Sequence, residues 1–187
     1  GAGKNCKNFV VVTLGTGVGA GILLNGQLLR GVNGTAGEAG HMVIEADGQP
    51  CPCGRRGCWE QYASASALKR ITREAMQFHP DSALWAHCGG DLDKIGGRSA
   101  FLVAKETGDP TARVVCQRYI RYLGIGIVNL INLFQPELLC IGGGVSNEED
   151  EALLYPLQQI VKTKCYGRDH GQVGGQAVLG RQQWAPT

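Results

Sequence analysis

Short runs of β-branched and apolar residues are separated along this chain by longer segments with helical periodicity. Phe9–Leu14 is too short for a helix and predicts a buried strand. Asn25-Gly26 separates two apolar runs and predicts a β-hairpin, because a type I′ turn requires positive φ at both central positions. Further strands are expected at Leu138–Ile141 and, shorter, at Ala177–Leu179.

The predicted helices lie between and after these strands. Apolar positions from Trp59 to Phe78 share one face and predict a single helix. The segment 80–97 has little periodicity and is expected to be a loop, and a short helix is expected over Ser99–Glu106. Another helix is predicted from about Glu149 to Lys162.

The longest predicted helix runs from Thr111 to about Phe134. Asp109 is a good N-cap in front of Pro110, which suits the first helical position. Gly124-Ile125-Gly126 in its middle costs helix stability, so we expect these glycines to allow the close approach of another backbone. The order hairpin, helices, strand, helix, strand predicts an α/β architecture in one domain.

Charge and hydropathy narrow the classes of function. A formal charge of +2 without a basic stripe argues against nucleic acid as a direct partner. No apolar run approaches the length that spans a membrane, and residues 1–8 lack the apolar core of a signal peptide. With 43% hydrophobic residues, the 187-residue chain can bury one sizeable core. We expect a soluble cytoplasmic protein.

One short segment concentrates metal-binding side chains. It places one histidine and three cysteines within eighteen residues: His41, Cys51, Cys53 and Cys58. One imidazole and three thiolates complete a tetrahedral shell for Zn²⁺ and leave no position for water. Such a closed site holds a loop in shape and performs no chemistry itself. We therefore expect a structural zinc ion here.

The cysteines admit other interpretations. Only Pro52 separates Cys51 from Cys53, so these two could not easily form a disulfide. The chain has eight cysteines, but 187 residues is long for a scaffold that depends on bridges. The remaining five are scattered singly, as reduced core cysteines are: Cys6, Cys88, Cys116, Cys140 and Cys165. A free thiol cluster remains the alternative to zinc.

Two glycine-rich loops follow predicted strands. Gly15-Thr16-Gly17, with Ala20, formally fits a dinucleotide-binding pattern, but that motif requires a helix next and the sequence predicts a strand. The loop could bring backbone amides and the Thr16 hydroxyl to a phosphate, or be only a bulged hairpin. Gly142–Gly144 lies between a buried strand and a helix, where ligands commonly bind. Together the two loops predict a nucleotide held between them.

Two glutamates flank the predicted metal loop. Glu38 lies three residues before His41 and Glu60 two residues beyond Cys58, so folding around zinc brings both carboxylates to one place. A zinc-bound imidazole keeps its second ring nitrogen protonated, so His41 can also donate to a ligand oxygen. Carboxylates that contact adjacent hydroxyls suit a sugar site. The alternative is that both glutamates are solvated surface residues.

The metal loop resembles the signature of the ROK family, named for repressors, open reading frames and kinases. The pattern E-x-G-H followed by G-x-x-C-x-C-G-x-x-G-C-x-E is matched by Glu38, Gly40, His41, Gly48, Cys51, Cys53, Gly54, Gly57, Cys58 and Glu60. Leu14–Gly21 resembles the family's second phosphate loop and Ile141–Ser146 its adenosine loop. The resemblance runs from about Gly3 to about Leu179.

The resemblance implies an actin/hexokinase-like (ribonuclease H-like) ATPase fold with an inserted zinc loop, of which residues 1–180 look like the larger, C-terminal lobe. The sequence is most similar to the glucokinases among members, which implies phosphorylation of a hexose, glucose, by ATP with Mg²⁺. It also implies a homodimer, which no pattern here requires. By analogy, the sugar contacts are Glu38, His41 and Glu60. The phosphate contacts are Gly15, Thr16 and Gly17, and the adenosine contacts are Gly142, Gly143 and Gly144.

Both ends of the chain depart from the family pattern. Family kinases carry a catalytic aspartate in an Asn-Asp motif just upstream of the strand that begins here at Phe9, and this sequence contains no Asn-Asp. After Leu179-Gly180 the family continues into a small-residue helix, whereas residues 181–187 form an atypical tail. We therefore expect a fragment that is inactive by itself.

Two other functions compete with the kinase. A sugar-responsive repressor of the same family would carry its DNA-binding helices before Gly1. Retention of Glu38 and of both glycine loops favours the kinase, because a sensor does not need the nucleotide site. A zinc-knuckle nucleic-acid module is poorer, since Arg55 and Arg56 are the only basic residues near the site.

Overall fold

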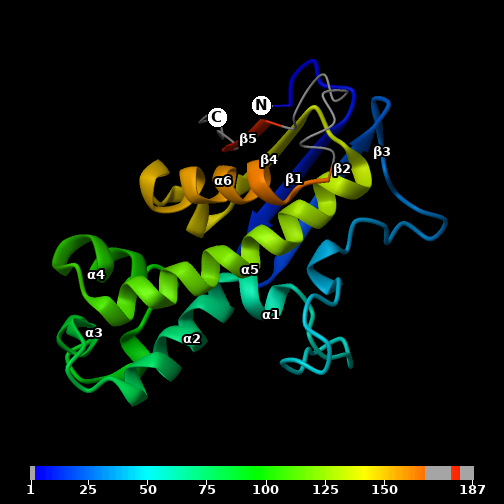
Figure 1. Cartoon of the computed structure of the whole chain (residues 1–187). Helices are drawn as coiled ribbons and strands as arrows, with labels where there is room; N and C mark the ends of the chain where they lie inside the picture. The colour runs from blue at the N-terminus through cyan, green and yellow to red at the C-terminus, as the bar shows by residue number, and fades with distance from the viewer. Residues whose placement is uncertain (1–2, 167–177, 182–187) are drawn as a thin grey trace, which may run out of the picture.

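The computed structural model describes residues 3–166 and 178–181, which build a mixed sheet flanked by helices (Figure 1). The sheet has the order β3-β2-β1-β4-β5. The strands are β1 (Phe9–Leu14), β2 (Val18–Leu24), β3 (Gln27–Leu28), β4 (Leu138–Gly142) and β5 (Val178–Arg181). β1 pairs antiparallel with β2 and parallel with β4, so it lies at the centre of the sheet.

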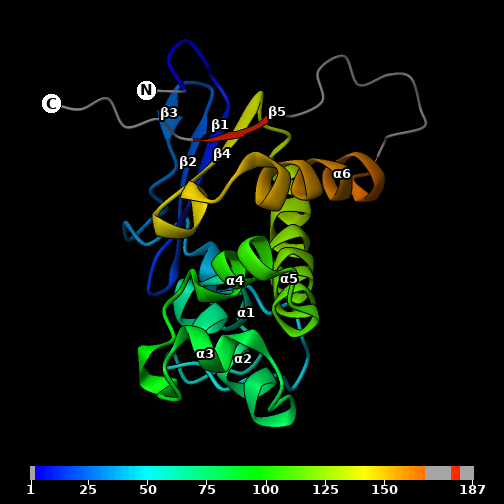
Figure 2. The ribbon, with the colours of Figure 1, turned by 90° about the vertical axis from the view of Figure 1, so that its left-hand side faces the viewer.

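The helices form two groups. They are α1 (Glu60–Ala63), α2 (Ala65–Phe78), α3 (Ala83–His87), α4 (Ser99–Thr107), α5 (Pro110–Phe134) and α6 (Tyr155–Lys164). α5 and α6 lie side by side next to the sheet, whereas α1 to α4 gather around the other end of α5 (Figure 2). No helix in the described ranges is long and apolar enough to cross a bilayer.

The main core lies between the sheet and the long helix. The side chains of Val10, Val12 and Leu14 alternate along β1 and are fully buried against residues of α5 such as Leu123 and Ile127. A second cluster joins α2, α3 and α4, and its buried members are Met76, Leu84, Cys88, Ile95, Val103 and Ala112. The fold thus has a sheet layer and a helical extension that share α5.

The strands agree with the sequence prediction. β1 occupies the predicted Phe9–Leu14, and β4 covers Leu138–Ile141 with one further residue. Asn25 and Gly26 have φ values of 52° and 78°, as the type I′ hairpin requires. β5 spans Val178–Arg181, whereas Ala177, with which the last strand was expected to begin, lies outside the described residues.

The helix predictions need three corrections. The expected single helix from Trp59 is two helices, because Ser64 is extended (ψ 165°) and its hydroxyl accepts from the Ala67 amide at 3.0 Å, which caps α2. The expected loop 80–97 contains α3 and a 3₁₀ turn at Leu92–Lys94, stabilised by the second cluster. The expected helix from Glu149 begins as a π-helical turn, Asp150–Leu154, before α6.

Asp109 caps α5, as predicted, and also binds the preceding helix. Its carboxylate accepts from the Ala112 amide at 2.8 Å, the Ser82 hydroxyl at 2.9 Å and the Ala83 amide at 2.9 Å. Burial would raise the pKa of this carboxyl, but these hydrogen bonds outweigh burial and lower the pKa below its ordinary value of 3.8. The carboxylate therefore ties α3 to the start of α5.

Replacing Asp109 by Ala should lower the free energy of unfolding by about 2–3 kcal/mol, since a cap and two further charged hydrogen bonds are lost. Because the folded pKa is depressed, this stabilisation is complete above the unfolded pKa and disappears as the pH falls through the folded value. Urea melts at pH 7 and pH 3 measure both effects. The control is Asp91→Ala, which removes one exposed cap and should cost less than about 1 kcal/mol.

Candidate functional site

The predicted metal-binding side chains meet at one point. The donor atoms of His41, Cys51, Cys53 and Cys58 all lie within 4.8 Å of one another. Nδ1 of His41 is 3.6 Å from Sγ of Cys51, and the sulfur atoms of Cys53 and Cys58 are 3.6 Å apart. The described residues therefore contain a cluster that could hold a metal ion.

Backbone pairing closes the loop that carries these ligands. The Trp59 amide donates to the Met42 carbonyl at 2.8 Å and the Ile44 amide to the Gly57 carbonyl at 2.9 Å, which brings His41 beside Cys58. Gly57 has a φ of 77°, and a Cβ there would lie 1.7 Å from the carbonyl oxygen of Glu45. Only glycine fits this close backbone approach.

The thiols differ in their proton affinity. Burial raises the pKa of Cys51 to about 12, and its thiol donates to Oε1 of Glu60 at 3.1 Å. A hydrogen bond from the Arg55 backbone lowers the pKa of Cys53, which is exposed, to about 6. Cys53 is therefore more readily deprotonated than Cys51, from which a metal ion would have to displace the proton.

Glu60 lies against the metal cluster. Its side chain is 17% exposed, and Oε1 is 3.8 Å from Nδ1 of His41. Glu38 is exposed in front of the 3₁₀ turn Ala39–His41, and its backbone carbonyl accepts from the His41 amide at 3.0 Å. The side chains of two expected sugar contacts, His41 and Glu60, therefore lie close together. The third, Glu38, contacts His41 through a backbone hydrogen bond.

Trp59 fixes this part of the chain to the long helix. The indole is fully buried, and its N–H donates to the Tyr122 carbonyl at 2.9 Å. A Cβ at Gly126 would lie 2.0 Å from the indole, whereas a Cβ at Gly124 would meet Ile160 at 2.9 Å. The prediction of close backbone approach at these glycines is therefore wrong, because both make room for side chains.

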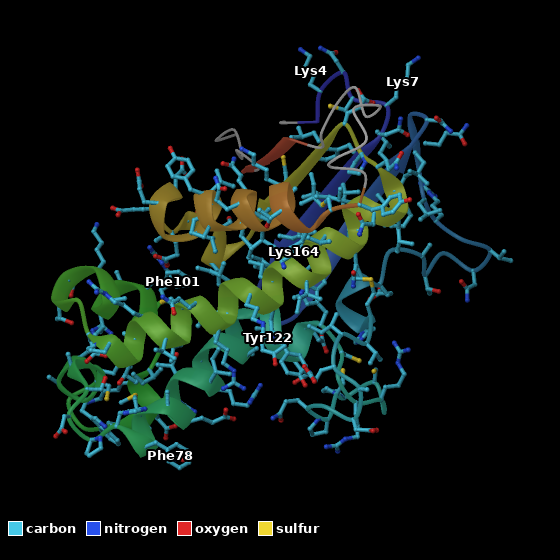
Figure 3. All side chains as sticks on the ribbon, in the orientation of Figure 1. Lys4, Lys7, Phe78, Phe101, Tyr122 and Lys164 are labelled. Carbon is cyan, nitrogen blue, oxygen red and sulfur yellow. The ribbon has the colours of Figure 1, made fainter. Side chains whose placement is uncertain are left out.

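Two tyrosines hold the other arm of the loop. The rings of Tyr62 and Tyr122 lie 4.6 Å apart, and Figure 3 shows Tyr122 on the side of α5 near the loop. The Tyr62 hydroxyl accepts from the Gln49 amide at 2.7 Å, and that of Tyr122 donates to Glu45 at 3.3 Å. These contacts could not be predicted from the sequence, in which only the aromatic character of the two residues offered a signal.

The first glycine loop turns directly beside Glu60. Gly15–Gly17 joins β1 to β2, as predicted, where a dinucleotide motif would need a helix. A Cβ on Gly17 would lie 2.8 Å from Oε2 of Glu60, and the Gly15 carbonyl accepts from the Ala65 amide at 2.8 Å. Gly15 itself has open space, since a Cβ there would meet nothing within 4 Å.

The second glycine loop lies beside the first. Because β1 and β4 are parallel neighbours, the residues that follow them share one edge of the sheet. Gly143 has a φ of 91°, and its Cβ would lie 2.4 Å from the Leu14 carbonyl oxygen, whereas Gly144 is open. The metal cluster, Glu60 and both glycine loops are therefore consecutive neighbours along this edge.

Comparison with known proteins identifies the family. A model described as the ROK family matches residues 1–181. The glucokinase of Halalkalibacterium halodurans is 40% identical over 200 residues, which cover 98% of this chain and 59% of that protein. The xylose repressor of Bacillus subtilis is 35% identical over 170 residues, covering 90% of this chain and 39% of the repressor. The chain belongs to the ROK family.

A solved structure shows the same fold. The ROK family glucokinase from Streptomyces griseus, solved in complex with glucose and AMPPNP, superposes with a TM-score of 0.84 at 35% identity and covers 96% of this chain and 57% of that one. The actin/hexokinase-like fold expected from the resemblance is thus confirmed. The chain spans between half and two thirds of the length of these glucokinases.

Proposed function

We propose that the metal cluster binds a structural zinc ion. In a tetrahedral site with Zn–S of about 2.3 Å and Zn–N of about 2.0 Å, S–S and S–N edges are about 3.8 Å and 3.5 Å. Two of the six pairs among the four donor atoms, His41–Cys51 and Cys53–Cys58, have separations of 3.6 Å, close to these edges. His41 Nδ1 faces Cys51, so Nε2 would be the nitrogen left to donate to a ligand.

We further propose that the chain is the zinc-containing, C-terminal lobe (residues 1–180) of an ATP-dependent hexose kinase that acts on glucose. The observation that carries this proposal is the contact between Gly17 and Glu60, which places the expected phosphate loop against an expected sugar ligand. Glu38, His41 and Glu60 would bind sugar hydroxyls and orient the reacting hydroxyl towards the phosphates. The similarity to two glucokinases supports the choice of substrate.

The two glycine loops would hold the nucleotide. Gly15, Thr16 and Gly17 would contact the phosphates through backbone amides and the Thr16 hydroxyl, and Gly142, Gly143 and Gly144 the adenosine. Mg²⁺, bound with ATP, supplies positive charge against the transferring phosphoryl group. The general base on the sugar hydroxyl would be an aspartate outside the given sequence, which contains no Asn-Asp pair.

A sugar-sensing repressor is the alternative, since a xylose repressor is 35% identical. The kinase is preferred because the first glycine loop contacts Glu60 and the second lies beside the first at one edge of the sheet, an arrangement that sugar sensing alone does not need. Nucleotide binding discriminates the two functions. A cytoplasmic location and a homodimer stay predictions.

Titration calorimetry with glucose and with AMPPNP tests the proposal. We expect the chain to bind both ligands and, without the general base, to form no glucose 6-phosphate in a coupled assay. Gly15→Ala should weaken AMPPNP binding at least about tenfold, because its methyl would occupy open space beside the phosphates. Glu60→Gln should weaken glucose binding by a similar factor, because a charged hydrogen-bond acceptor is lost.

The matched controls are Gly96→Ala and Glu74→Gln. A Cβ at Gly96 would meet only Ser99, at 3.8 Å, and Glu74 is an exposed partner of Arg70 on α2. Neither should alter the Kd of either ligand. Binding of glucose without binding of AMPPNP would favour the sugar-sensing repressor. Formation of glucose 6-phosphate by this chain would mean that the general base lies within it.

A further inference from the structure

Two ion pairs join α4 to the end of the loop Gly143–Asn147, which begins within the second glycine loop. The residue after the 3₁₀ turn Gly144–Asn147 is Glu148, whose carboxylate accepts from Nε of Arg98. The Glu148 side chain is 6% exposed and that of Arg98 47%. Next to this pair, Nζ of Lys105 lies 2.5 Å from Oε1 of Glu149. The partly buried Arg98–Glu148 pair is the more consequential one, since exposed pairs contribute little.

The beginning of the same loop is also fixed. The Gly143 carbonyl accepts from the Ser146 hydroxyl at 2.7 Å and from its amide at 3.1 Å. Val145 is buried in the main core, whereas Gly144 and Asn147 are exposed. The loop is therefore held at both ends, and its open glycine lies between the two attachments.

Arg98 belongs to a segment that reaches the first glycine loop as well. A Cβ on Gly97, the neighbour of Arg98, would lie 3.1 Å from Cβ of Ala65. The Ala65 amide donates to the Gly15 carbonyl at 2.8 Å. Arg98 thus contacts Glu148, which follows the second loop, and Gly97 lies against Ala65, which is hydrogen-bonded to the first loop. One short segment therefore contacts residues that hold each of the two loops.

We propose that Arg98 is a positioning residue for the nucleotide: through Glu148 it orders the loop Gly143–Asn147 in the conformation that receives the ligand. This inference deepens the proposed function and rests on it for the identity of the ligand. Arg98 does not have to touch the nucleotide for this role. Without the Arg98–Glu148 ion pair, the nucleotide would have to order the loop when it binds, and the entropy lost in that step would weaken its affinity.

Hydrogen exchange of the unliganded protein tests the ordering directly. Arg98→Met keeps much of the side-chain volume but removes the charge, and should speed amide exchange in residues 144–148 about tenfold. Arg98→Lys should restore part of the protection. Arg73→Met is the control, because it removes another ion pair, with Asp93 at 3.0 Å, from the same helical group and should leave this loop unchanged. Equal exchange in Arg98→Met and the unmodified chain would overturn the proposal.

The second measurement is affinity. Arg98→Met should weaken AMPPNP binding about tenfold while the Kd for glucose stays within about twofold, a split that general destabilisation would not produce. Because Arg98→Met removes the cationic partner of a buried carboxylate, the double variant Arg98→Met/Glu148→Gln should show the same loss of affinity with a smaller fall in melting temperature. An unchanged Kd for AMPPNP would overturn the positioning role. If the unmodified chain binds no AMPPNP, the proposed function fails, and hydrogen exchange still decides whether Arg98 orders the loop.

Discussion

Chelation of the proposed zinc ion should lower the melting temperature of this protein by about 10 °C, because a ligand that binds only the folded state stabilises it by about 4 kcal/mol at a thousandfold excess over its Kd. Removal of the metal should also make the thiols of Cys51, Cys53 and Cys58 reactive towards a thiol reagent. Cys53→Ser should have the same effect on the melting temperature and should lose the metal, since a serine hydroxyl is a poor zinc ligand.

The control for the metal experiment is Cys6→Ser. Cys6 is half-buried near the amino end and lies outside the ligand cluster, so its replacement should leave metal content unchanged. Metal analysis of the purified protein and thiol titration before and after chelation provide the measurements. Thiol reactivity that does not change on chelation, with no metal in the purified protein, would contradict the zinc site.

Gly126→Ala should destabilise the fold by about 3 kcal/mol, because the added methyl would overlap the indole of Trp59 in a fully buried position. Trp59 lies between Cys58 and Glu60, so moving it off α5 displaces an expected metal ligand and an expected sugar ligand together. We therefore expect glucose binding to weaken more than about tenfold. Thermal melts and glucose titration measure the two effects.

Gly124→Ala provides the matched control two residues earlier on the same helix. Its methyl would meet Cδ1 and Cγ2 of Ile160, both at 2.9 Å, so this half-buried side chain has to shift. Alanine is the better helix former by about 1 kcal/mol, which offsets part of that cost. The stability should change by less than about 1 kcal/mol and glucose binding should stay the same. If both substitutions gave equal losses, the specific role of the Trp59 contact would be excluded.

The strands and the metal loop were predictable because their signals are local. A β-branched run, an Asn-Gly turn and an Asp-Pro cap each act within a few residues, so β1, the hairpin and the start of α5 lie where expected. The break at Ser64 was missed, because apolar positions on both sides keep the same face. The helix at Ala83–His87 was missed too, because its stability comes from packing on α2 and α4.

The sequence by itself determined the family, the order of the strands along the chain and the set of side chains that can bind a metal. Each of these depends on residue types and their spacing within short segments, which can be read directly from the sequence. Only the tertiary structure decided which distant groups meet: Glu60 with Gly17, Gly143 with Leu14, Trp59 with Gly126, and Arg98 with Glu148. These contacts depend on how helices and strands pack, and many sequence patterns are compatible with each pairing until the whole core is assembled.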